Sequence, residues 1–93
     1  MPTSTIDQQG LASKIDIHPN PTAGDFTIAF PRQLLERNLN IKIVDVLGRT
    51  LLDIDNGDRA ERLTVNIPEM NSGVFFVVVS GEKFEHVERL VKQ

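Results

Sequence analysis

Cysteine, tryptophan and tyrosine are all absent from this chain of 93 residues. Without cysteine the chain cannot form disulfides, thiolate zinc sites, iron–sulfur clusters or a thiol nucleophile. The redox state of its compartment stays open, because a domain of this length can build a core without disulfides. The only aromatic residues are five phenylalanines, so the usual platforms for stacking sugars or bases are missing and carbohydrate binding is disfavoured.

Long apolar runs and an excess of positive charge are missing as well. The longest apolar run, 74–79, has six residues, whereas a membrane-spanning helix requires about 20. The net charge is −3, with acids and bases interleaved, so we expect no nucleic-acid partner. The first residues contain neither a basic stretch nor the apolar core of a signal peptide. We therefore expect either a cytoplasmic protein or a piece of a longer secreted one.

Turn residues divide most of the chain into short apolar segments. Residues 1–13 are rich in Thr, Ser, Gln and Gly, and we interpret them as a linker or tail before one domain at 14–93. Around 33–37 we expect one or two helical turns. Apolar stretches predict strands at 15–17, 26–30, 41–46, 51–54, 63–67, 74–80 and 83–91. Seven such strands predict an all-β, seven-stranded antiparallel immunoglobulin-like β-sandwich.

The segment 74–80 is unusual because both of its faces are apolar. A sandwich strand with one solvated face should instead alternate between apolar and polar residues. One interpretation is a central strand whose outer face lies under a loop or under residues 33–37. The other is an exposed apolar stripe that meets a second protein.

Residue patterns that carry catalysis or metal binding are not found. His18 and His86 lack the spaced partners of a metal site. The acidic segment 53–58 partly matches a calcium-binding loop, but its glycine comes one place early and Thr64 stands at the twelfth position. Ser72 and Ser80 have no histidine or acid at an interpretable spacing. We therefore expect no enzyme, no cofactor and no small-molecule substrate.

Three segments stand out by composition and spacing. The first runs from Ile17 to Gly24 and contains Pro-Asn-Pro, the second is Ile43–Arg49, and the third is Met70–Val79. A basic segment, Arg89–Lys92, follows them. In this order, over residues 14–92, the segments resemble the type A C-terminal sorting domain of the type IX secretion system, also called the Por secretion system.

The resemblance implies a non-catalytic address label on a longer secreted protein of a Gram-negative, Bacteroidetes-type bacterium. The implied partners are an N-terminally fused cargo domain, the outer-membrane translocon or shuttle of the type IX machinery, and a sortase-like cysteine protease. The cargo would reach the cell surface or the medium through the periplasm and outer membrane, and the protease would cut in or beside 1–13. The sorting-motif residues that it implies for recognition and fold are Pro19, Asn20, Pro21, Gly24, Asp45, Gly48, Arg49, Gly73, Phe75, Arg89, Val91 and Lys92.

The same motif residues have structural explanations. Two prolines around Asn20 predict a rigid corner, and turn glycines such as Gly48 and Gly73 suggest positive φ angles. Strand alternation puts Arg89 and Lys92 on opposite faces of the last strand. We therefore expect the strand end to fray and Lys92 to be the exposed contact. Arg89 is expected to pair with Glu85 or Glu88.

Two other classes of function remain open at this point. An immunoglobulin-like accessory or adhesion module could bind a protein or a glycan with the same strands. A passive spacer within a surface protein would need no partner. The lack of tryptophan and tyrosine disfavours the glycan version, and the basic segment at 89–92 favours the sorting signal over the spacer.

Overall fold

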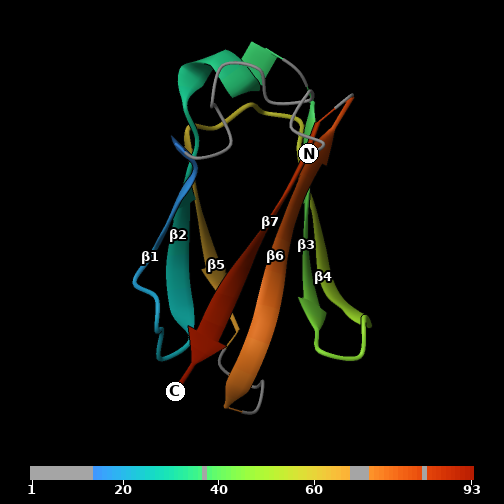
Figure 1. The fold of residues 1–93 in the computed structure, drawn as a ribbon. Coiled ribbons are helices and arrows are strands. Elements are labelled where there is room, and N and C mark those ends of the chain that lie inside the picture. Colours follow the sequence, from blue (N-terminus) through green and yellow to red (C-terminus); the bar gives the residue numbers. More distant parts are fainter. Residues whose placement is uncertain (1–13, 37, 68–71, 83) are drawn as a thin grey trace.

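Two antiparallel sheets pack face to face in the computed structural model of the chain (Figure 1). The structure describes residues 14–36, 38–67, 72–82 and 84–93, so the predicted tail at 1–13 lies outside the described residues. One sheet has the strand order β1-β2-β5 and the other β4-β3-β6-β7. The seven-stranded immunoglobulin-like sandwich expected from the sequence is confirmed.

Each strand follows its predicted apolar segment to within one or two residues at either end. The helical turns expected near 33–37 form the 3₁₀ segment η3 (Arg32–Glu36), and no helix in the described part of the chain has the length and apolarity to cross a membrane. The strands are β1 (Asp16–His18), β2 (Asp25–Ala29), β3 (Leu39–Asp45), β4 (Thr50–Asn56), β5 (Arg62–Asn66), β6 (Gly73–Gly81) and β7 (Phe84–Lys92).

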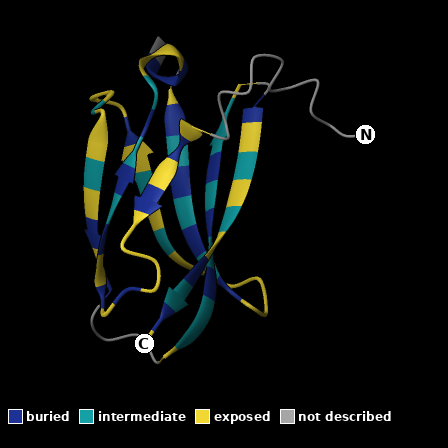
Figure 2. Cartoon of the chain, turned by 60° about the vertical axis from the view of Figure 1, so that its left-hand side comes forward, coloured by how far each residue is buried: buried dark blue, intermediate teal, exposed yellow. Residues whose placement is uncertain are grey.

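The core lies between the sheets and is built from every second residue of the strands. Along β3 the residues alternate between buried and half-buried, and Figure 2 shows the same banding on neighbouring strands. Ile28 of β2 and Ile41, Val77 and Val79 of the larger sheet are fully buried. Each such side chain contributes roughly 1.5–3 kcal/mol to the free energy of unfolding, so the alternation in the sequence fixes which face of each strand is internal.

Segment η3 closes one end of the sandwich. Its Leu34 and Leu35 belong to the buried core, and the N–H of Leu34 donates to the Pro31 carbonyl at 3.0 Å. Figure 1 shows η3 at the end opposite the C-terminus and the β3–β4 turn. Among the described residues, η3 is the 3₁₀ segment that closes an end, so the two ends of the sandwich differ there.

Strand β6 is central, between β3 and β7, but the cover expected from 33–37 is wrong because η3 packs its leucines into the core. The inward residues of β6 are buried and its outward residues are half-buried. Side chains of adjacent strands flank the outward ones, with Lys42 opposite Val78 and Arg89 opposite Phe76. The apolar outer face of β6 is therefore only partly covered.

Gly73 begins β6 with a φ of +149°, and no other atom lies within 4 Å of the place where a Cβ would be. Backbone conformation, rather than crowding, therefore requires glycine here. We expect Gly73→Val to lower the free energy of unfolding by about 1–3 kcal/mol, measured by urea unfolding followed by circular dichroism.

Gly57→Ala is the matched control, because Gly57 is exposed and a Cβ there would only touch the Asp55 carboxylate at 3.7 Å. Its effect should stay within about 1 kcal/mol. If Gly73→Val unfolds like the wild type and yet abolishes export, Gly73 is read directly by a partner and the structural explanation is wrong.

Candidate functional site

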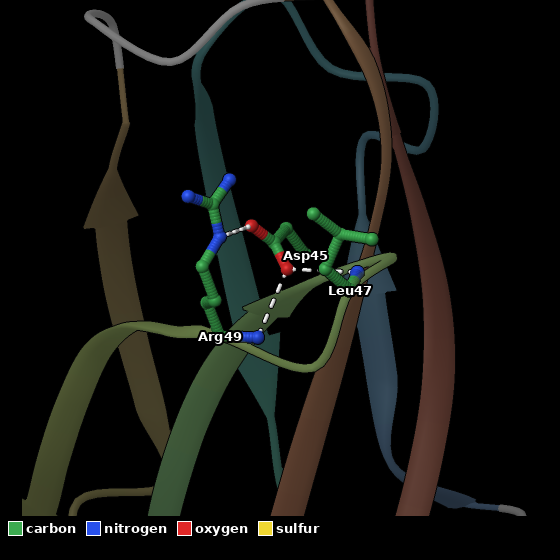
Figure 3. Close-up of polar contacts among 3 residues, drawn as sticks. All are labelled: Asp45, Leu47 and Arg49. Atoms are coloured by element: carbon green, nitrogen blue, oxygen red, sulfur yellow. Dashed lines mark hydrogen bonds and ion pairs between the residues drawn. The ribbon is translucent and has the colours of Figure 1, made fainter.

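The turn between β3 and β4 is organised by one carboxylate (Figure 3). Asp45 Oδ1 accepts the backbone N–H groups of Leu47 and Arg49, both at 2.9 Å. Its Oδ2 accepts the Arg49 Nε–H at 2.7 Å. The Asp45 N–H also donates to the Arg49 carbonyl and the Gly48 N–H to the Asp45 carbonyl, each at 3.0 Å. The Asp45 side chain therefore satisfies backbone N–H groups of the turn and holds the conformation of the turn.

These hydrogen bonds also set the charge state of Asp45. The N–H of Arg49 is the largest influence that holds the pKa of the Asp45 carboxyl below its ordinary value of 3.8. The Arg49 guanidinium and the Leu47 N–H act in the same direction, whereas burial acts against them. Asp45 is 11% exposed and Arg49 72% exposed, so the carboxylate is shielded inside the turn while its cation faces solvent.

Gly48 completes the turn with a φ of +85° and open space around its missing Cβ. An L-residue in this left-handed region costs roughly 1–2 kcal/mol. The tip then presents two apolar side chains, since Val46 is 67% exposed and Leu47 75% exposed. Our sequence analysis missed this pair, although two large apolar residues beside a turn glycine, where polar residues are usual, were the available signal.

The corner expected between β1 and β2 is present, and hydrogen bonds hold it against β7. The Asn20 amide donates from Nδ2 to the Arg89 carbonyl at 2.8 Å and accepts at Oδ1 from the Val91 N–H at 3.0 Å. Thr22, two residues after Asn20, continues this pairing. Its N–H donates to the Val91 carbonyl and its carbonyl accepts from the Gln93 N–H, both at 2.8 Å. Asn20–Thr22 therefore acts as a short additional strand against β7.

The expected roles of Lys92 and Arg89 are wrong in part. Strand β7 stays regular through Lys92 because the corner holds its end, and Lys92 is only 8% exposed on the inward face beside Leu90. The alternation that we predicted holds, but its exposed cation is Arg89. The ion pair that the structure shows for Glu88 is with His86 Nε2, at 3.0 Å.

Parts of all four motif segments lie at one end of the sandwich. Asp45 lies opposite Phe75 of β6, and Gly73 lies opposite Lys92. The corner reaches this end through its hydrogen bonds to β7, as Figure 1 shows beside the C-terminus. We call this region the motif end and define it by Pro19–Gly24, Asp45–Arg49, Gly73–Phe75 and Arg89–Lys92. Segments from four parts of the sequence thus lie at the same end of the sandwich.

The remaining candidates from the sequence, which are His18 and the acidic segment 53–58, make local contacts. His18 contacts Asp16 at 2.7 Å on exposed β1. In the acidic segment, Asn56 turns inward and exchanges two hydrogen bonds of 3.1 Å with the backbone of Ala60. Among the residues that the structure describes, no three His, Asp or Glu side chains are grouped so as to hold a metal ion.

The fold is thus a small β-sandwich whose motif side chains hold two turns and a strand edge at one end. The family model described as the secretion system C-terminal sorting domain matches residues 16–93, and a comparison with curated proteins gave no match. The chain belongs to this family of type IX secretion sorting signals, a family that is not catalytic.

Membership gives the motif end a biological setting. A sorting domain of this family implies an N-terminally fused cargo, interaction with the type IX machinery, and export to the cell surface or secretion. Parts of the three motifs from which the resemblance was inferred lie together at this end of the fold.

The low pKa of Asp45 makes a pH-dependent prediction. A depressed folded-state pKa means that the ionised carboxylate stabilises the fold above its unfolded pKa and that this stabilisation is lost as the pH falls through the folded pKa. We expect Asp45→Asn to lower the thermal midpoint at neutral pH. Its difference from the wild type should narrow progressively below about pH 4.

Asp55→Asn serves as the control for this experiment, because Asp55 is an exposed residue of β4. It should change the midpoint little across the same pH series. A difference between Asp45→Asn and the wild type that stays constant down to the most acidic point would show that the carboxylate's charge does not support the turn.

The corner yields a second stability prediction. Asn20→Ala removes two hydrogen bonds to β7, each worth about 0.5–1.5 kcal/mol. We therefore expect the free energy of unfolding, measured in urea, to fall by about 1–3 kcal/mol. Deleting Lys92 and Gln93 should also destabilise the fold, since it removes a buried side chain and the Gln93 bond to Thr22.

Asn38→Ala tests whether loss of an asparagine matters by itself, because Asn38 is exposed just before β3. Its effect should stay within about 0.5 kcal/mol. Equal stabilities for Asn20→Ala and Asn38→Ala would show that the corner does not hold β7.

Proposed function

We propose that the motif end is the surface that the type IX translocon or its shuttle recognises, and that Val46 and Leu47 are its apolar contact. The observation that carries this proposal is the combination of high exposure with a fixed turn. Both side chains project from a tip whose backbone is held by the Asp45 carboxylate. A preorganised apolar group loses little conformational entropy on binding, so an exposed pair that would be a liability on a spacer is suited to recognition.

The end of the sandwich at which the described chain begins also supports recognition at the motif end. Strand β1 runs from Asp16 toward the corner at Pro19, so the described domain is entered at the end away from the motif end (Figure 1). A cargo fused ahead of the domain would therefore attach on the far side from the recognised surface. The machinery could hold the motif end without displacing the cargo.

Proteolytic cleavage between cargo and domain would take place ahead of β1. We propose that a sortase-like cysteine protease cuts in or beside residues 1–13, whose polar composition suits a protease cleft, whereas strands paired within a sandwich are poor substrates. Cargo would then pass through the periplasm and outer membrane of a Bacteroidetes-type bacterium before release or anchoring.

The two exposed cations of the motif end are further proposed contacts. Arg49 is 72% exposed and lies beside the apolar tip, and Arg89 is exposed on β7. The buried Lys92 is better suited to packing the strand end. Recognition through positive charge therefore uses the two arginines.

A reporter experiment tests the proposal. Fusing the full chain behind a periplasmic reporter should send the reporter outside a cell that possesses the type IX machinery. Replacing both tip residues, Val46→Ser with Leu47→Ser, should leave the thermal midpoint nearly unchanged, because both side chains are exposed. Export should nevertheless fall at least several-fold, because the apolar contact is lost.

Leu51→Thr is the matched control, since Leu51 is another exposed apolar residue but lies on β4 outside the turn. It should be exported like the wild type. Equal export of the reporter with and without the domain would contradict the sorting function itself. Normal export of the folded double variant would instead remove only the tip from the mechanism.

A further inference from the structure

The outer edge of β7 is covered over only part of its length. The corner satisfies the Arg89 carbonyl, both backbone groups of Val91, and the Gln93 N–H. It acts there as a parallel partner, since Thr22 forms a parallel bridge with Lys92. The edge of β7 is therefore able to accept a strand, and the molecule itself supplies one along its C-terminal half.

Register identifies the backbone groups that remain at this edge. Because Arg89 and Val91 direct backbone groups away from β6, the odd-numbered residues of β7 face the edge and the even-numbered ones pair with β6. Pairing with β6 is continuous from Phe84 to Lys92, so Val87 and Glu85 share this orientation. Within the described residues, no backbone hydrogen bond reaches the outward groups of these two residues.

The other edges carry the protection that natural sheets normally show. Strand β4 has a register irregularity against β3 near Ile43 and Val44. Strand β1 has three residues, and β5, the other edge of the smaller sheet, has five. The N-terminal half of β7 belongs to a regular nine-residue strand whose pairing with β6 is continuous, and the C-terminal half of the same edge already carries a partner.

The side chains along this open half define what would fit beside it. Glu85, Val87 and Arg89 lie on the outer face of the sheet, opposite Ser80, Val78 and Phe76 of β6. Val87 is 52% exposed, between an acid on one side and a base on the other. On the inner face, His86 and Glu88 contact each other at 3.0 Å.

We propose that the open edge of β7 over Glu85–Arg89 binds an extended segment of a partner protein as an additional antiparallel strand. Main-chain hydrogen bonds to Val87 and its neighbours would supply the affinity, and alternate side chains the specificity. Read in the direction of the partner chain, the segment carries an acid opposite Arg89, an apolar residue opposite Val87 and a base opposite Glu85. The intervening residues are polar, because they face His86 and Glu88.

A second copy of this chain fits the charges but not the space. The order Glu85, Val87, Arg89 is self-complementary when two copies of β7 run antiparallel with Val87 opposite Val87. In that register, however, Glu82 and Phe84 of the second copy would run along the line that Asn20–Thr22 already occupies beside β7. A single extended strand can bend away from β7 at Arg89. Strand β7 of a second copy cannot, because it is paired with its own β6. The partner is therefore an extended segment rather than a copy.

This inference concerns the side of the sandwich and does not rest on recognition of the motif end. The test uses the full chain and the peptide acetyl-Glu-Thr-Val-Thr-Lys-Thr-amide. We expect saturable binding at up to millimolar peptide, followed by NMR, with shifts and slowed hydrogen exchange at the amides of Glu85, Val87 and Arg89. The same peptide N-methylated at its valine should bind at least tenfold more weakly, because it lacks the N–H that faces Val87.

Two variants separate strand addition from contact between side chains. Val87→Pro removes the outward N–H without breaking the β6 ladder and should weaken binding at least tenfold. Glu85→Lys should weaken it about two- to five-fold, and exchanging the peptide lysine for glutamate should restore it. If Val87→Pro fails to fold, the N-methylated peptide and the Glu85→Lys exchange still decide the question.

Three results would overturn the proposal. No saturable binding at millimolar peptide excludes the assigned sequence pattern. Equal binding of the N-methylated peptide shows that side chains alone dock on the outer face. Dimers that form without peptide and dissociate in Val87→Pro would assign the edge to a second copy instead of a partner segment.

Discussion

The hydrogen bonds between the Asn20–Thr22 corner and the end of β7 join the two sheets of this sandwich through the backbone. Strands β1 and β7 belong to different sheets. Elsewhere in the described part of the chain, the sheets meet through the apolar side chains of the core, whose attraction is non-directional. The Asn20 side chain sets the distance between the corner and β7, because its amide donates to the Arg89 carbonyl and accepts from the Val91 N–H. The last strand is consequently regular to Lys92 and the motif end has a defined shape.

The β3–β4 turn uses the same physical solution with a charged group. A carboxylate with two backbone donors and one guanidinium donor holds the loop, and charge-assisted hydrogen bonds are stronger than neutral ones. The apolar tip can therefore stay rigid without being buried. Much of the family signature is explained by these two local structures, while the parts available to a receptor are the exposed side chains that they position.

The corrections to the sequence analysis have one common cause. Lys92 was expected in solvent because it lies one residue from the C-terminus, where strands usually fray. A residue distant in sequence, Thr22, pairs with this end, so the strand does not fray and the Lys92 side chain is turned inward. The cover of β6 by residues 33–37, one of the two alternatives for its outer face, was likewise wrong, because the half-burial of that face comes from the flanking strands.

The sequence by itself determined the strands, their inward faces and the turn glycines, because alternation and positive φ are local properties of the chain. It also carried the family resemblance, since the motifs are contiguous segments. Only the tertiary structure decided that Pro19–Gly24, Asp45–Arg49 and Arg89–Lys92 share one end, and that Asn20 binds β7. Those contacts depend on strand order and register, which join residues up to 71 positions apart, and local composition does not encode which distant backbone groups an amide will meet.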